Sequence, residues 1–279
     1  MREPNPPHTG QKNYFLVVTL EKFKNKRNLN QEIVKNGWTI MDCSELKKEQ
    51  LKLASRIIVY DGFTTIKTIA GATCLNFQNK ILASIVVLEY PSFTLLEKKT
   101  YWLSDPIPYR PGFQAYREMP ALLEAYNLLE TEPDILLVSG AGRAHPRKIG
   151  LASHLGLALN LPTIGITEKL VFGRVEQGKI YINYEICGFE VRTREHANPV
   201  YVSPGHLVAL DSALEVVSKT ILYPHKLPEP LHAAHKLGRK MLKEKEETNT
   251  ILTEDKLKER VEKVGLKEMS LLQETSNPN

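Results

Sequence analysis

The order of its strand-like and helix-like segments is the feature that most constrains the fold of this chain. Three strand-like segments occupy residues 65–77, 80–90 and 92–103, and the Gln-Asn-Lys between the first two predicts a β-hairpin turn. Helix-like and strand-like segments alternate after residue 111. An antiparallel start followed by such alternation predicts an α/β fold, with a mixed sheet flanked by helices on both faces.

The later segments are assigned from apolar periodicity and turn residues. Helices are expected at about 44–59, 112–130, 147–160, 211–222 and 228–242, and strands at 134–140, 162–167 and 198–205. A hairpin over residues 181–193 is expected to turn at Gly188, and Asp211 is the expected N-cap of its helix. His232 and His235 are spaced i,i+3 on the last helix and are interpreted as surface residues.

Composition divides the chain into three parts. Residues 1–43 form an expected N-terminal extension, residues 44–242 the folded domain, and residues 243–279 a charge-dense C-terminal tail. With 42% hydrophobic and 25% charged residues, the chain has the composition of a globular protein.

Several protein classes are disfavoured by the same composition. No apolar run reaches the ~18 residues of a membrane span, and the polar, proline-rich start lacks the apolar core of a signal peptide. Cys43, Cys74 and Cys187 are too far apart for a CxxC zinc site, and their odd number argues against a disulfide framework. We therefore expect a cytoplasmic protein without a membrane partner. The formal charge of +5 is compatible with a nucleic-acid partner but does not establish one.

The stretch "ILLVSGAGRAHPRKIG" has the form of an active-site corner. An apolar strand ends at Ser139, and a glycine-rich basic turn leads directly into a helix. Ligands of α/β proteins bind at the carboxyl ends of such strands, where a catalytic carboxylate is often found. Here that position carries a serine in place of an acid.

Three stretches together resemble the endonuclease V family: "PYRPGFQAYREMPALLEA", "AHPRKIGLASHLGLALNLPTIGI" and "SPGHLVALDSAL". They occur in the family order, and the resemblance covers roughly residues 44–232. It implies an RNase H-like fold and an activity that cuts nucleic acid near inosine with magnesium. Another RNase H-like group is the alternative.

The resemblance assigns the family's catalytic positions to five residues. Glu118 matches the acid on the helix, and His206 matches the histidine of the Gly-His motif. The first strand acid, in the family motif "IAGAD", is Thr73 in "IAGAT", and the acid of "DGHG" is Ser139 in "SGAG". Glu168 stands where the family has a lysine. We expect Glu118 and His206 to face the point where Thr73 and Ser139 converge.

These replacements weaken the expected metal site. Magnesium prefers carboxylate and water oxygens and binds poorly to neutral hydroxyl groups. We therefore expect Mg²⁺ to be absent or held weakly by Glu118, and cleavage to be lost or weak. The alternative is a metal ion held through water by Glu118, Glu168 and Asp211.

The residues by which the family recognises a base are largely present. Two prolines stiffen the loop that presents Tyr109, which the resemblance implies is a wedge beside a flipped-out base. Without the resemblance, Tyr109 is equally an ordinary loop aromatic. Gln114 replaces an apolar residue of the family, which affects the expected base preference. The expected nucleic-acid-binding residues are Tyr109, Gly112, Gly140, His145, Arg147, Leu151 and Gly165.

Two further cations lie near the expected start of the helix after this corner. Arg143 and Lys148 flank Arg147, and the backbone N–H groups of a helix N-terminus favour phosphate.

Three functions follow from these observations. The leading one is an endonuclease V homologue that binds DNA or RNA at inosine or other deaminated or distorted sites, with weak or lost cleavage. The second is an active endonuclease V with displaced metal ligands, acting in DNA repair or cutting RNA 3′ to inosine. The third is a non-catalytic assembly or regulatory subunit that contacts a protein partner through residues 1–43 and 243–279.

Overall fold

The computed structural model of this chain describes residues 43–248. The expected N-terminal extension, except Cys43, and the tail beyond residue 248 lie outside the described residues. The chain forms two compact units, Met1–Gly238 and Arg239–Asn279. The first contains the sheet, and the described residues of the second, 239–248, are helical. The domain boundaries drawn from composition stay predictions.

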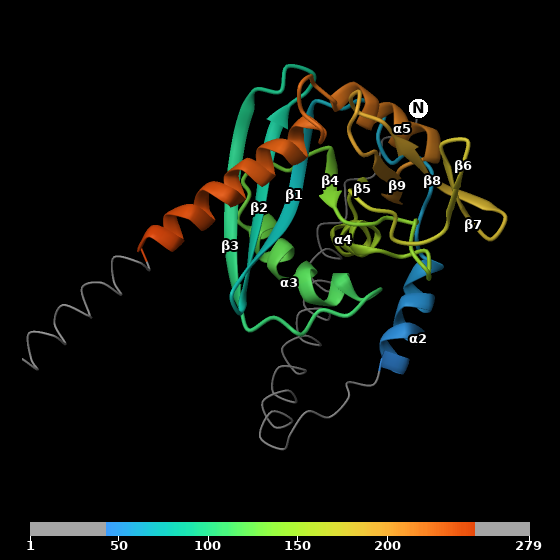
Figure 1. Cartoon of the computed structure of the whole chain (residues 1–279), viewed down its shortest axis with the longest axis horizontal. Helices are drawn as coiled ribbons and strands as arrows, with labels where there is room; N and C mark the ends of the chain where they lie inside the picture. Colours follow the sequence, from blue (N-terminus) through green and yellow to red (C-terminus); the bar gives the residue numbers. More distant parts are fainter. Residues whose placement is uncertain (1–42, 249–279) are drawn as a thin grey trace, which may run out of the picture. The chain divides into compact units, whose positions relative to one another are not determined.

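A mixed sheet forms the centre of the first unit (Figure 1). Within the described residues it has nine strands in the order β3-β2-β1-β4-β5-β9-β8-β7-β6. The strands are β1 Thr68–Phe77, β2 Lys80–Glu89, β3 Leu95–Ser104, β4 Ile135–Ser139, β5 Thr163–Thr167, β6 Arg174–Glu176, β7 Lys179–Ile182, β8 Glu185–Val191 and β9 Val200–His206.

The strand directions agree with the order expected from the sequence. β1, β2 and β3 form an antiparallel meander, with the β1–β2 turn at Gln78 and Asn79. β1, β4 and β5 are parallel, and β9 returns antiparallel to β5. The expected α/β fold with a mixed sheet is therefore confirmed.

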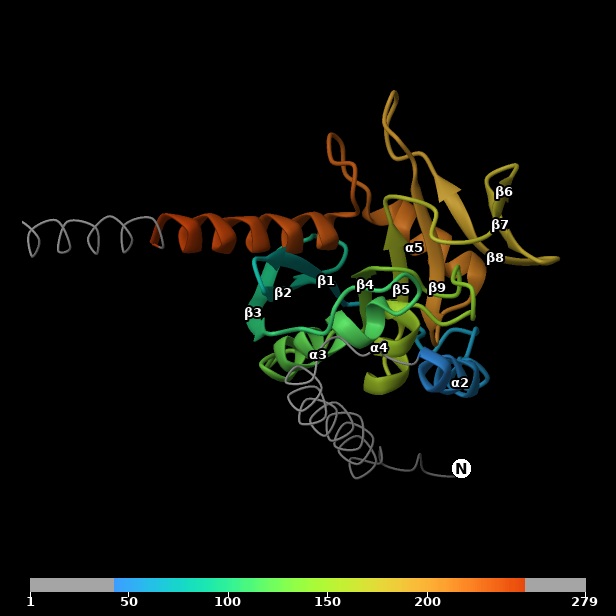
Figure 2. The same ribbon diagram turned by 60° about the horizontal axis from the view of Figure 1, so that its bottom comes forward.

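Helices cover both faces of the sheet (Figure 2). One apolar core joins α3 (Gln114–Asn127) and α4 (Leu151–Leu159) to the sheet, and the other joins α5 (Leu210–Thr220) and the helix that begins at residue 229. Side chains alternate along β1, so that Ile69 belongs to the second core and Ala70 to the first. Helix α2 (Cys43–Ala54) packs Leu46 in a smaller apolar cluster.

The position of one hairpin turn differs from the expectation. The hairpin of β7 and β8 turns at Asn183 and Tyr184, and Gly188 lies inside β8. Asn183 has a φ of 58°, a conformation that asparagine tolerates better than most residues. A Cβ at Gly188 would lie 2.3 Å from the carbonyl oxygen of Val202. Close packing against β9, and not a turn, therefore requires this glycine.

Three helix ends also differ from the expectation. α2 ends at Ala54, before a run of β-branched residues, and α4 begins only at Leu151, after Lys148 adopts a φ of 52°. Asp211 lies in the first turn of α5 and is not its N-cap, which is Ala209.

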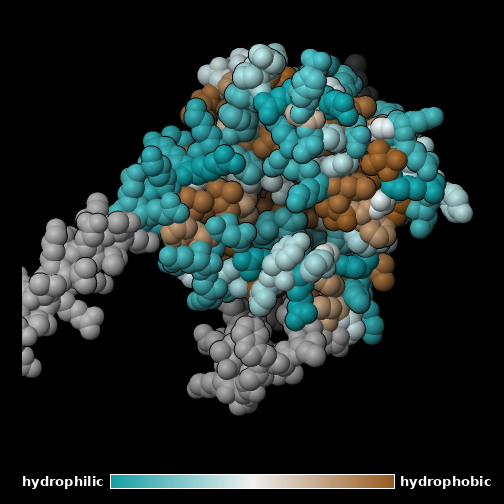
Figure 3. Space-filling view, viewed as in Figure 1, coloured by the Kyte–Doolittle hydropathy of each residue, from teal (hydrophilic) through white to brown (hydrophobic). Residues whose placement is uncertain are grey.

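No helix in the described part of the chain has the length and apolar character needed to cross a bilayer. The face in Figure 3 is largely hydrophilic, with separate apolar patches.

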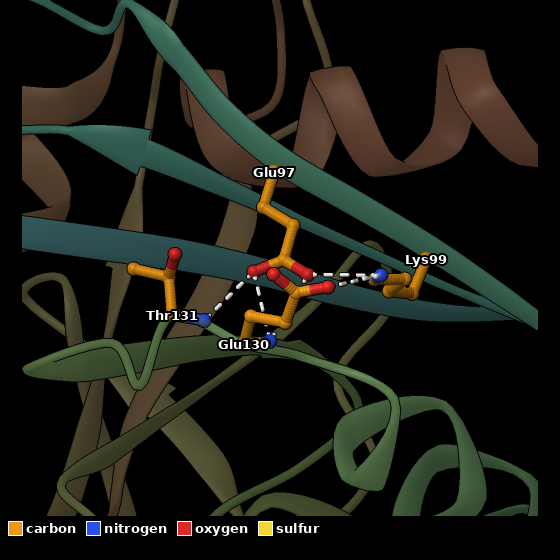
Figure 4. Close-up of polar contacts among 4 residues, drawn as sticks. All are labelled: Glu97, Lys99, Glu130 and Thr131. Atoms are coloured by element: carbon orange, nitrogen blue, oxygen red, sulfur yellow. Dashed lines mark hydrogen bonds and ion pairs between the residues drawn. The ribbon is translucent and has the colours of Figure 1, made fainter.

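A carboxylate ties the edge strand β3 to the segment after α3 (Figure 4). Glu97 accepts hydrogen bonds from the backbone N–H groups of Glu130 at 3.0 Å and Thr131 at 2.8 Å, and pairs with Lys99 at 3.2 Å. Burial alone would raise the pKa of Glu97, but these bonds outweigh it and hold the pKa below its usual range. The ionised carboxylate therefore stabilises this edge of the sheet.

Candidate active site and base pocket

Thr73 and Ser139 lie on neighbouring parallel strands and on the same face of the sheet. Ala72 of β1 is opposite Val138 of β4, so the next residues of both strands point to the other face. A Cβ at Gly71, two residues before Thr73, would lie 2.0 Å from the carbonyl oxygen of Pro230. The two hydroxyls therefore lie on the face covered by α5 and the helix that begins at residue 229.

A histidine that the sequence analysis placed on the surface contacts Thr73. Thr73 is buried, and its Oγ1 lies 3.2 Å from Nε2 of His235. Leu231, Ala234 and Gly238 of the same helix are buried. With His235 they follow the i, i+3, i+4, i+7 spacing of a buried helix face. The same spacing in the sequence could have predicted that His235 lies on the face of the helix that packs against the sheet.

His206 does not join these residues. It pairs with Thr163 at the start of β5, whereas Ser139 pairs with Ile166 further along the same strand. Three residues of strand span about 10 Å. A Cβ at Gly156 of α4 would lie 2.7 Å from the Cβ of His206, which places His206 on the α4 face. The expected convergence of His206 with the two hydroxyls does not occur in the structure.

Glu118 is a buried carboxyl on α3, beside β1. Its backbone carbonyl oxygen lies 3.9 Å from Sγ of Cys74, the neighbour of Thr73 in the chain. Gln114 donates a hydrogen bond from Nε2 to Oε2 of Glu118 at 3.0 Å. Burial raises the pKa of Glu118 to about 7, and the bond from Gln114 and the charge of Arg117 offset only part of this effect. The carboxyl therefore exchanges its proton near neutral pH.

Glu168 directly follows β5 and forms an ion pair with Lys226. Nζ of Lys226 lies 2.7 Å from Oε2 of Glu168. The position where the resemblance implies a lysine thus carries an anion, and its charge is matched by a lysine from the segment after α5.

The donor groups that the resemblance identifies do not fit Mg²⁺, and they do not converge: α3, which carries Glu118, packs on the face of the sheet opposite Thr73 and Ser139. Thr73 and Ser139 offer neutral hydroxyls, and Glu118 is a buried carboxyl whose pKa is about 7. Magnesium requires oxygen ligands in near-octahedral geometry and is usually held by carboxylates. Across residues 43–248, no group of three or more His, Cys, Asp or Glu side chains is placed to hold a metal ion. Glu168 and Asp211 therefore do not complete such a group with Glu118.

A small pocket gathers four of the residues expected to bind a base: Tyr109, Gly112, His145 and Leu151. Its space of about 50 Å³ is enough for one or two water molecules, so a base enters only if side chains move. We call it the base pocket. It is lined by Gln50, Tyr109, Gly112, Gln114, Ala115, Ala141, His145, Ile149, Gly150, Leu151 and Val171.

Gly140 and Gly165 shape this pocket without lining it. A Cβ at Gly140 would lie 2.9 Å from the Cβ of Leu151, and a Cβ at Gly165 would lie 2.2 Å from the backbone nitrogen of Gly142. Glycine at residue 165 therefore lets the loop between β4 and α4 pack directly on β5, and glycine at residue 140 leaves room for the side chain of Leu151.

Arg147 holds the wall of the base pocket together. Its Nη2 donates to the carbonyl oxygen of Gly112 at 2.7 Å, its Nε bonds to Gln50, and its guanidinium lies 4.7 Å from the centre of the Phe113 ring. Gln50 is buried on α2 and also donates to the carbonyl oxygen of Gly112, at 3.1 Å. No sequence motif identifies Gln50, because α2 precedes all of the motifs; its burial in the structure identifies it.

His145 is neutral in this wall. Burial lowers the pKa of His145 to about 4, and the nearby charge of Arg147 adds to the effect. Its Nε2 lies 3.1 Å from the carbonyl oxygen of Gly112, and its Nδ1 accepts a bond from the backbone N–H of Arg147 at 3.3 Å. Nε2 therefore carries the proton. Tyr109 differs from these residues, since its side chain lines the pocket and is 63% exposed.

Comparison with known proteins agrees with this geometry. The family model described as Endonuclease V matches residues 51–236. A protein named Endonuclease V from Dictyoglomus thermophilum is 36% identical over 206 residues, which cover 71% of this chain and 90% of that protein.

Solved structures of endonuclease V proteins are also similar to this chain in fold. Endonuclease V from Bacillus subtilis superposes with a TM-score of 0.69 at 27% identity, covering 76% of this chain and 97% of that chain. Endonuclease V from Ciona intestinalis, in complex with a 24mer DNA containing an inosine followed by a ribo-adenosine, gives a TM-score of 0.67 at 26% identity. That match covers 74% of this chain and 99% of the other. The mixed sheet with helices on both faces is consistent with the expected RNase H-like fold. The chain belongs to the endonuclease V family.

Proposed function

We propose that this chain binds nucleic acid at inosine or another deaminated or distorted base, and that its magnesium-dependent cleavage is lost or weak. One observation carries the proposal. Four of the residues expected to bind a base line one small pocket, while Thr73 within β1 and Ser139 at the end of β4 carry hydroxyls where the resemblance implies carboxylates.

Nucleic-acid binding is supported by the pocket and by a relative. A similar structure, endonuclease V from Ciona intestinalis, is in complex with DNA that contains an inosine. In this chain Tyr109 combines an exposed ring with a position in the pocket wall. A planar side chain at such a position can fill the gap that a flipped-out base leaves in a stack.

Weak or absent cleavage is supported by the chemistry of the donors. A divalent ion in a nuclease activates water and compensates the charge that develops on the phosphate. Here the hydroxyl of Thr73 is engaged by His235, and Glu118 shares its carboxyl with the amide of Gln114. Neither arrangement supplies the fixed negative charge that holds Mg²⁺.

The test is a binding titration with labelled strands, followed by analysis of their length. DNA and RNA strands with one inosine are compared with strands that carry guanosine at the same position, in EDTA and in Mg²⁺ at fixed salt. The proposal predicts tighter binding of inosine strands, which stay full-length in Mg²⁺ apart from slow cleavage. No binding to any strand would favour the assembly or regulatory subunit. Rapid cleavage would favour the active enzyme with displaced ligands.

A further inference from the structure

The loop between β4 and α4 carries three cations close to the base pocket. Arg147 points inward and is bonded to the carbonyl oxygen of Gly112. Arg143 and Lys148 instead converge on the carboxylate of Glu185. Nη2 of Arg143 lies 2.6 Å from Oε1 of Glu185, and Nζ of Lys148 bonds to Oε2. Arg143 and Lys148 therefore contact different oxygens of the same carboxylate.

Glu185 reaches these cations from another part of the sheet. It is the first residue of β8, directly after the Asn183 and Tyr184 turn of the β7–β8 hairpin. The group is open to solvent, because the side chains of Arg143, Lys148 and Glu185 are 19%, 35% and 43% exposed. A ligand can therefore reach the cations without unfolding the loop.

We propose that Arg143 and Lys148 form a phosphate site for the bound nucleic-acid strand, and that Glu185 fills this site until a phosphate displaces it. The inference rests on the proposed function, since it assigns a backbone contact to the strand whose base enters the pocket. Carboxylate and phosphate oxygens accept the same charge-assisted bonds from arginine and lysine, so one can replace the other.

The position of the two cations fits a phosphate next to the bound base. Lys148 is followed in the chain by Ile149, Gly150 and Leu151, which line the base pocket. Leu151 is also the first residue of α4, so Lys148 lies three residues before the start of this helix. The positive end of the α4 dipole therefore adds to the field of the two cations.

The exchange of carboxylate for phosphate is energetically accessible. An ion pair that is partly exposed contributes little to stability, so its loss is a small cost. The bonds from Lys148 and the charge of Arg143 hold the pKa of Glu185 below its usual range, although burial opposes them. Glu185 is therefore ionised at neutral pH and competes with the strand for the cations.

Glu185→Gln removes the competing charge and keeps the size of the side chain. We expect it to bind a labelled inosine-containing single strand roughly fivefold more tightly than the wild-type chain at low salt, because the variant removes two partly exposed ion pairs that compete with the strand. The logarithm of the binding constant should also fall more steeply with the logarithm of salt, by about 0.7 for the phosphate that gains free cations. Arg143→Ala combined with Glu185→Gln should cancel both changes.

The control is Glu176→Gln, which removes the same charge from the exposed pair with Arg174 on β6. A second variant, Lys148→Gln, tests the site without relying on the folding of the Glu185 variant. It should bind the strand more weakly than the wild-type chain does. If Glu185→Gln matches Glu176→Gln while the wild type still prefers inosine, this inference is wrong and the proposed function stands. If none of these proteins binds any strand, both are wrong.

Discussion

Replacing Glu118 with glutamine is expected to stabilise the protein at pH 8 and to leave its stability unchanged at pH 4. Glu118 is 7% exposed, and burial raises the pKa of its carboxyl from 4.5 to about 7. Between these values the unfolded chain has lost the proton and the folded chain keeps it. The free energy of unfolding of the wild type therefore falls as the pH rises from 4.5 to about 7, and levels off above.

The size of the effect follows from the two pKa values. They differ by about 2.5, and each unit corresponds to 1.36 kcal/mol, so the ionised carboxyl costs roughly 3 kcal/mol at pH 8. Glutamine avoids this cost because it is neutral at every pH, and its oxygen can still accept the bond from Gln114.

Urea unfolding between pH 4 and pH 8 in EDTA measures the difference. Glu124→Gln, on the same helix α3, gives the effect of removing one charge elsewhere on this element. Equal stability of Glu118→Gln and the wild type at pH 8 would show that a cation or water already solvates the carboxylate. If Mg²⁺ then stabilised the wild type and not Glu118→Gln, the site would hold metal and the account of its chemistry would be wrong.

Three further predictions use other parts of the molecule. Tyr109→Ala should weaken binding to inosine-containing strands by ~1–3 kcal/mol at fixed salt. Tyr60→Ala, which removes a tyrosine of similar exposure (65% against 63%), should not change the binding. Thr73→Asp with Ser139→Asp should gain Mg²⁺ binding by calorimetry and slow nicking of inosine-containing strands, and a folded double variant that binds no Mg²⁺ refutes this. Glu97→Gln should lower the free energy of unfolding by about 1–3 kcal/mol at pH 7, because hydrogen bonds to a charged group are lost. The deficit should disappear as the pH falls through the lowered pKa of Glu97, and a deficit that persists in acid would contradict it.

Local patterns were sufficient to predict most of the fold. The meander of β1 to β3 and the alternation of β4, α4 and β5 follow from strand periodicity and turn residues, which depend on neighbours in the chain. The hairpin assignment failed at Gly188 because that glycine meets the backbone of Val202, a contact between strands that no local pattern reports.

The positions of candidate site residues could be predicted where sequence motifs determine them, and could not be predicted where tertiary contacts determine them. The motifs placed Tyr109 and His145 in one pocket. The position of His206 depends on the pairing of β9 with β5, and the contact of His235 with Thr73 depends on how the last helix packs on the sheet. The bond between Arg147 and Gln50 likewise depends on α2, which carries none of the motifs.

The most direct test of the central claim is a cleavage assay in which the protein is in excess over a labelled inosine-containing strand. A band-shift gel of the same samples measures the fraction bound, and a denaturing gel measures the product after incubation in Mg²⁺. Our account predicts that the strand is bound in preference to a guanosine control and remains full-length apart from slow cleavage. Rapid conversion of the bound strand to product by the wild-type chain, dependent on Mg²⁺ and absent in EDTA, would contradict it.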